Sequence, residues 1–178
     1  MRTLLTALLF LALTLPLAAM AEPSSIVVVR HAEKADDGTR DPALTAAGRA
    51  RAEALADALQ HADVTGLIAS QYKRTRQTLA VLGERQGLEV TVVPAESGGI
   101  RAHISSIARA VSEWSSGGVL VIAGHSNTVP LIVEALSGEP VSPIDEAEYD
   151  RLFVLLPGNP SMKVISARYG TASEPSAH

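Results

Sequence analysis

Short apolar runs alternate along the chain with segments whose apolar residues recur at helical spacing. The run SIVVV at residues 25–29 predicts a buried strand, and further strands are expected at residues 66–69, 89–93, 119–123, 152–156 and 163–168. Helices are expected between them, at residues 45–61, from about residue 75 onward, and at residues 100–114 and 128–136. This alternation predicts an α/β fold: a three-layer α/β/α sandwich around a mostly parallel sheet of about six strands.

Individual positions support the helices. Thr45 has a side chain suited to cap the first helix, in which Leu55 and Leu59 lie one turn apart. His61 and His103 are predicted to be surface residues of helices, and Asn127 is expected to cap the helix that follows it. Arg76 is expected to face solvent.

The first 21 residues have the pattern of a secretory signal peptide. Arg2 precedes an apolar run at residues 4–15, Pro16 interrupts it, and Ala19 and Ala21 fit a cleavage site after residue 21. The alternative, an uncleaved membrane anchor, is less favoured because the run is short for a span of roughly 20 residues. We therefore expect a signal peptide at residues 1–21, one domain at 22–170 and a flexible tail at 171–178, in a periplasmic or secreted protein.

Composition narrows the classes of function. The chain has 178 residues, 47% of them hydrophobic, with 15 basic and 19 acidic side chains and a formal net charge of −4. No basic excess is present to neutralise a nucleic-acid backbone, so a general nucleic-acid binder is excluded. Because the sequence contains no cysteine, disulfides, thiolate metal sites and a cysteine nucleophile are excluded as well.

Residues able to bind phosphate follow the predicted strands. Arg30 and His31 come after the first strand, His125 and Ser126 follow the strand at 119–123, and Arg74 comes shortly after the strand at 66–69. In parallel sheets ligands bind beyond the carboxyl ends of the strands. Arginine makes paired, charge-assisted hydrogen bonds to phosphate, and histidine can act as a nucleophile or proton carrier. We expect these side chains to converge on a phosphoryl group.

Four segments resemble the histidine phosphatase superfamily, the phosphoglycerate-mutase-like group, branch 1. They are VVVRHAEK at 27–34, LTAAGRARAEALA at 44–56, SQYKRTRQTL at 70–79 and VLVIAGHSNTV at 119–129, in the family's order. The resemblance implies a phosphoglycerate-mutase-like fold and a phosphatase in which His31 forms a phosphohistidine. Arg30, Arg74 and His125 would hold the phosphoryl oxygens, with Ser126 and Asn127 as further binding residues. It also implies that no metal or organic cofactor is needed.

The proton donor to the leaving group is left open by the sequence. Glu96, in the segment after the strand at 89–93, is favoured, and Glu33 and Asp36, just beyond His31, are its rivals. The motifs lack both the fuller acidic element of the mutase branch and the His-Asp pair of the acid-phosphatase branch.

Two other functions fit parts of the sequence. A protein that binds phosphate or phosphosugars without turnover would use the same pocket, and AGHSNT resembles the nucleophile elbow of serine hydrolases, with Ser126 as nucleophile. The esterase is disfavoured because Thr128 replaces the last glycine and only His178 follows the serine. The expected partner is a small phosphorylated substrate, with no nucleic acid and no membrane after cleavage of the signal peptide; the oligomeric state cannot be read from the sequence.

Overall fold

The computed structural model describes residues 22–95, 98–159 and 161–173, so the predicted signal peptide and Glu96 lie outside the described residues. A single six-stranded sheet has the order β3-β2-β4-β1-β5-β6. Its strands are β1 (Ser25–Arg30), β2 (Val64–Ala69), β3 (Val90–Val92), β4 (Val119–Gly124), β5 (Arg151–Leu156) and β6 (Lys163–Arg168). The first four are parallel, whereas β5 pairs antiparallel with β1 and with β6. The predicted α/β fold with a mostly parallel sheet is confirmed.

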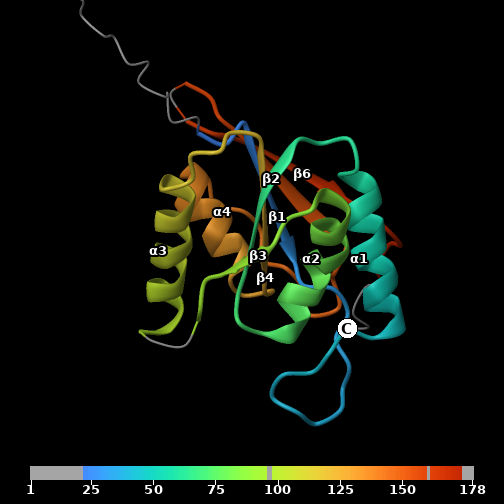
Figure 1. Cartoon of the computed structure of the whole chain (residues 1–178). Coiled ribbons are helices and arrows are strands. Elements are labelled where there is room, and N and C mark those ends of the chain that lie inside the picture. The colour runs from blue at the N-terminus through green and yellow to red at the C-terminus, as the bar shows by residue number, and fades with distance from the viewer. Residues whose placement is uncertain (1–21, 96–97, 160, 174–178) are drawn as a thin grey trace, which may run out of the picture.

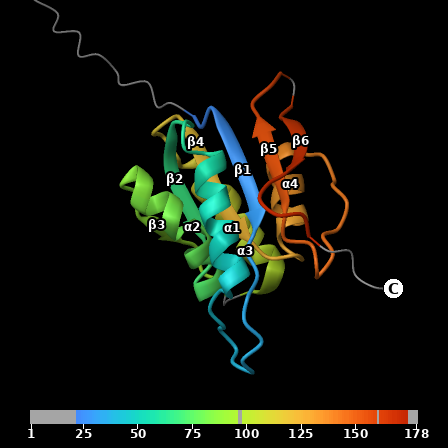
Figure 2. The same ribbon diagram turned by 90° about the vertical axis from the view of Figure 1, so that its right-hand side faces the viewer.

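Among the described residues, four helices cover the two faces of this sheet. They are α1 (Ala46–Ala58), α2 (Lys73–Gln86), α3 (Gly99–Ser112) and α4 (Val129–Ser137). Figures 1 and 2 show α1 and α2 against one face and α3 and α4 against the other. Each face has its own apolar cluster, with Leu55 and Leu79 on the α1 and α2 side and Ile107 and Ile132 on the other. Burying both faces of the strands explains why they are apolar throughout.

The register of the parallel strands places their carboxyl ends at one edge. Arg30 at the end of β1 lies opposite Gly124 of β4, and Ala69 at the end of β2 lies opposite Ala123. The residues that follow these strands therefore leave the sheet side by side, as parallel strands require.

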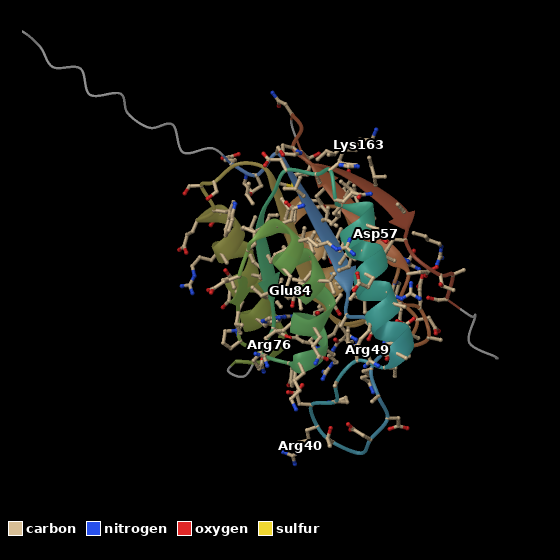
Figure 3. All side chains as sticks on the ribbon, turned by 45° about the vertical axis from the view of Figure 1, so that its right-hand side comes forward. Arg40, Arg49, Asp57, Arg76, Glu84 and Lys163 are labelled. Atoms are coloured by element: carbon tan, nitrogen blue, oxygen red, sulfur yellow. The ribbon has the colours of Figure 1, made fainter. Side chains whose placement is uncertain are left out.

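The start of α1 fixes the segment that follows β1. The Thr45 hydroxyl accepts a hydrogen bond from the Gly48 N–H at 3.0 Å, which confirms the predicted cap, and the Thr45 N–H donates to the Glu33 carbonyl at 2.9 Å. A β-carbon at Gly48 would collide with that same carbonyl, so the close approach requires glycine. The loop that connects β1 to α1 projects from the body of the molecule, with Arg40 at its tip (Figure 3).

The end of the described chain is tied to the sheet. The Ser173 hydroxyl accepts hydrogen bonds from the N–H groups of Tyr149 and Asp150, and its own N–H donates to the Asp150 carboxylate. Residues 174–178 of the predicted tail lie outside the described residues. Across the part of the chain that the structure describes, none of the helices combines the length and the apolar character needed to cross a bilayer.

Candidate active site

The end of β1 and the end of β4 bring two histidines together. The His31 N–H donates to the Gly124 carbonyl at 2.8 Å, and His125 is the next residue after Gly124. The imidazole rings meet edge to face, with their centroids 5.2 Å apart. The strand register therefore brings the predicted pair of histidines together.

Arg74 reaches the same place from the first turn of α2. Its guanidinium lies 4.3 Å from the centre of the Tyr72 ring, and that ring lies 5.4 Å from the His125 ring. Burial lowers the pKa of the Arg74 guanidinium, an effect that Tyr72 and Asp41 oppose. The guanidinium still carries its charge, because arginine stays protonated in proteins. Arg74 thus adds a positive charge beside His125.

One ring nitrogen of His31 is hydrogen-bonded to the backbone. Its Nδ1 lies 2.8 Å from the Ala32 carbonyl oxygen, which can only accept, so Nδ1 carries the proton and Nε2 keeps its lone pair. Burial lowers the pKa of His31 to about 3, with the charges of Arg30 and Arg74 acting in the same direction. At neutral pH the ring is uncharged, and Nε2 is the nitrogen available as a nucleophile.

His125 is held from behind by the turn that leads into α4. Its N–H donates to the Thr128 hydroxyl at 2.8 Å, and Thr128 is the residue at the N-terminal cap position of α4. The expectation that Asn127 caps this helix is wrong, because Asn127 is exposed and lines a cavity instead. Burial is the main cause that lowers the pKa of His125 to about 3, and the proximity of His31 acts in the same direction.

The sequence predicts that Arg30 binds phosphate, whereas in the structure one end of its guanidinium binds the protein backbone. It is 1% exposed, and its Nη1 donates to three backbone carbonyls, those of Asp145, Glu146 and Glu148, at 2.8–2.9 Å. The Tyr149 ring covers its guanidinium at 4.0 Å. One end of the guanidinium therefore anchors residues 145–149, and only its other edge can face a ligand.

Three buried nitrogen atoms at this site have no hydrogen-bond partner. They are Nε of Arg30, Nε of Arg74 and Nε2 of His125. Over residues 22–95, 98–159 and 161–173 the only other such buried side-chain atom is the hydroxyl of Tyr169. Leaving a buried polar atom unpaired costs about 1–3 kcal/mol, so three of them around one histidine favour binding of an oxyanion that would pair with them.

The cavity next to this cluster has a volume of about 260 Å³. It is lined by Tyr72, Arg74, Ala95, Gly99, Ile100, His103, His125, Asn127 and Thr128. His103 is 3% exposed, with its Nδ1 3.3 Å from the Pro94 carbonyl oxygen, so the expectation of a surface histidine is wrong. The pattern of the helix could not reveal this, because the loop that covers His103 carries no periodic signal. His61 and Arg76, in contrast, are exposed as predicted; Figure 3 labels Arg76.

The three candidate proton donors differ in their surroundings. Glu33 is bound by Arg51 through two guanidinium nitrogens, at 2.7–3.0 Å, which leaves its carboxylate engaged on the α1 side. Asp36 is exposed in the projecting loop. Glu96 lies outside the described residues, although Ala95 and Gly99 on either side of it line the cavity.

Two residues that the sequence did not single out complete the rim. The Ser126 hydroxyl donates to the Glu146 carboxylate at 2.6 Å, and the same carboxylate accepts from Nη2 of Arg30 at 3.0 Å. Tyr149 covers Arg30, and its ring centre lies 6.1 Å from that of His31. Both residues come from the loop after α4, where the sequence has no helical or strand periodicity to place them.

The described residues include no group of three or more histidine and carboxylate side chains arranged to hold a metal ion.

Comparison with known proteins agrees with this arrangement. The sequence model of the histidine phosphatase superfamily (branch 1) matches residues 26–95, which include Arg30, His31 and Arg74. No curated protein matches the chain.

Among solved structures the chain resembles three phosphatases. A mycobacterial glucosyl-3-phosphoglycerate phosphatase in complex with inorganic phosphate is 18% identical, with a TM-score of 0.58 over 85% of this chain and 97% of that one. A protein histidine phosphatase, SixA, complexed with tungstate is 22% identical, with a TM-score of 0.58 over 74% and 86%. A candidate phosphohistidine phosphatase SixA from Agrobacterium tumefaciens is 24% identical, with a TM-score of 0.56 over 83% and 99%. At these identities the likeness establishes the fold.

The two histidines at the ends of β1 and β4, His31 and His125, predict a pH-dependent stability. Their pKa values are about 3 in the folded chain and about 6.5 as unperturbed side chains, so between these pH values the unfolded chain binds protons that the folded chain does not. The free energy of unfolding should therefore rise with pH through this window. Replacing both His31 and His125 with asparagine should remove roughly 1–3 kcal/mol of that rise, measured by urea unfolding at a series of pH values.

The matched control is His61→Asn at an exposed histidine, which should keep the full pH dependence. A double variant as steeply pH-dependent as the parent would contradict the buried, uncharged state of the two rings.

Proposed function

The sequence model of the histidine phosphatase superfamily (branch 1) matches residues 26–95, and on that premise we propose that the chain is a member of this family that hydrolyses phosphate monoesters through a phosphohistidine formed on His31. The observation that carries the proposal is the set of unpartnered buried nitrogens of Arg30, Arg74 and His125 around an uncharged His31 whose Nε2 is free. Nitrogens of this kind can bind a phosphoryl group through hydrogen bonds, because its oxygens are all hydrogen-bond acceptors.

The first step transfers the phosphoryl group to the protein. The Nε2 lone pair of His31 forms a bond to phosphorus while the bond from phosphorus to the ester oxygen breaks, and the departing oxygen takes a proton from an acid. Arg30 and Arg74 stabilise the negative charge spread over the phosphoryl oxygens. His125 lies within the same site, and the arriving negative charge raises its affinity for a proton, which lets Nε2 donate to a phosphoryl oxygen.

The second step releases phosphate. Water attacks the phosphorus of the phosphohistidine, the P–N bond breaks, and its electron pair returns to Nε2 of His31. The conjugate base of the acid accepts the proton that water loses. Splitting the displacement into two steps replaces one difficult reaction with two easier ones, and the side chains named here supply the positive charge.

We propose Glu96 as the proton donor. Its neighbours Ala95 and Gly99 line the cavity that also contains Arg74 and His125, which supports a carboxyl group close to the phosphate site. Glu33 is the weaker candidate, because the Arg51 guanidinium binds its carboxylate through two nitrogens and holds it toward α1.

We propose that the substrate is a phosphoester outside the cytoplasm. The support is the signal-peptide pattern of residues 1–21. Two similar structures were solved with oxyanions, one with inorganic phosphate and one with tungstate, which supports an oxyanion site in this fold. Ser126 and Asn127 are proposed as further contacts to the bound group.

Removing the nucleophile should abolish turnover. His31→Ala should lower kcat for p-nitrophenyl phosphate at least about a thousandfold, because no other group can accept the phosphoryl. His61→Ala, at an exposed histidine, is the matched control and should retain full activity. Ser126→Ala should lose at most about tenfold, because its hydroxyl binds Glu146 and is not the attacking group.

The same panel separates the alternative functions. An esterase that uses Ser126 would lose its activity in Ser126→Ala and keep it in His31→Ala. A binding protein would bind inorganic phosphate but hydrolyse none of a panel of phosphoesters.

The proton donor can be identified from the leaving group. Glu96→Gln should slow hydrolysis of an alkyl phosphate at least about tenfold more than that of p-nitrophenyl phosphate, because nitrophenolate leaves without a proton. The matched variants are Glu33→Gln and Asp36→Asn, measured with the same two substrates. If either of these shows the leaving-group dependence and Glu96→Gln does not, the assignment passes to that residue.

A further inference from the structure

Glu146 occupies the outer edge of the proposed phosphate site. Its Oε2 accepts from Nη2 of Arg30 at 3.0 Å, and its Oε1 accepts from the Ser126 hydroxyl at 2.6 Å. The side chain is 82% exposed, whereas that of Arg30 is 2% exposed. A carboxylate that reaches in from solvent thus already binds one of the two guanidiniums assigned to the phosphoryl group.

The contacts of Arg30 show which of its donors a phosphate must take. Nη1 is held by three backbone carbonyls, so Nε and Nη2 form the only edge on which a bidentate ligand can bind. The same edge of Arg51 binds the Glu33 carboxylate in this structure, through Nε and Nη2. On Arg30, Nε has no partner and Nη2 holds Glu146. A phosphoryl group that takes both donors must therefore displace the Glu146 carboxylate from Nη2.

Displacement leaves the carboxylate close by. Ser126, which follows His125, remains as its hydrogen-bond donor, and the backbone of Glu146 stays bound to Nη1 of Arg30. With the charge of Arg30 taken by the phosphoryl group, the carboxylate becomes an uncompensated negative charge beside the ester. Such a charge repels a second anionic group on the substrate and attracts a cationic one.

The surroundings give a leaving group room on this side. Ala147 and Tyr149, just beyond Glu146, line a cavity of about 610 Å³. Its charged lining residues are Glu33 and Arg51, which are paired with each other at 2.7 Å. On the other side of the site, Asp41 lies 3.9 Å from Arg74 and places a second carboxylate at the rim.

We propose that Glu146 determines the substrate class: it selects phosphoesters whose leaving group carries an ammonium group near the ester oxygen and disfavours those with a carboxylate or second phosphate there. This inference rests on the proposed phosphatase function. Because the carboxylate competes for Nη2 of Arg30, it also weakens the binding of free phosphate.

The test compares two substrates of similar length and opposite charge, phosphoethanolamine and phosphoglycolate, with p-nitrophenyl phosphate as a reference for phosphatase activity. The parent should show a kcat/KM at least tenfold higher for phosphoethanolamine than for phosphoglycolate. Glu146→Gln keeps the shape and removes the charge, and it should reduce that ratio at least fivefold, mainly through KM. Glu139→Gln, an exposed residue beyond the far end of α4, is the matched control and should leave the ratio unchanged.

A second measurement does not depend on turnover. Inorganic phosphate, titrated by calorimetry, should bind Glu146→Gln at least threefold more tightly than it binds the parent or Glu139→Gln. An active enzyme whose substrate ratio is the same in the parent and in Glu146→Gln overturns the inference and leaves the phosphatase assignment intact. Hydrolysis of none of the three esters overturns the phosphatase assignment, and an unchanged phosphate affinity in Glu146→Gln then overturns the role of Glu146 as well.

Discussion

The parallel pairing of β1 with β4, with Arg30 opposite Gly124, determines where Arg30, His31 and His125 meet. This register delivers His31 and His125 from adjacent strand ends. Strand β1, which ends at the buried Arg30, lies between β4 and β5 (Figure 2). A slip of one residue would move each side chain to the opposite face of the sheet. Apolar packing on both faces fixes the register, so the chemistry of the site depends on the hydrophobic core.

Burial then sets the charge of each group. Desolvation keeps both histidines uncharged, while the two arginines keep their charge in surroundings that give them partners. The backbone carbonyls of Asp145, Glu146 and Glu148 satisfy one end of Arg30, and the Tyr72 ring covers Arg74. The groups that remain unpaired are nitrogens around His31, which is the pattern of a site that binds an anion. The positive charge is in place before any ligand arrives, and the contact that an anion has to replace on Arg30 is that of Nη2 with the Glu146 carboxylate.

The sequence was sufficient for the fold and for the groups that regular structure positions. The strands and helices, the Thr45 cap and the meeting of His31 with His125 follow from periodicity and from the geometry of parallel strands. Glu146 and Tyr149 could not be placed, because the loop that carries them is fixed by side-chain contacts to Arg30 and not by any local pattern. The burial of His103 likewise depends on tertiary contacts, and so does the position of Thr128, not Asn127, as the N-cap residue of α4.

The most direct measurement is the position of the phosphoryl group on a trapped phosphoenzyme, read from the coupling between phosphorus and ring nitrogen in NMR spectra of the protein labelled with nitrogen-15. Because the Ala32 carbonyl holds Nδ1 of His31, the account predicts phosphorylation at Nε2 of that ring. A phosphoryl group on Nδ1 of His31, on His125 or on Ser126 would contradict it.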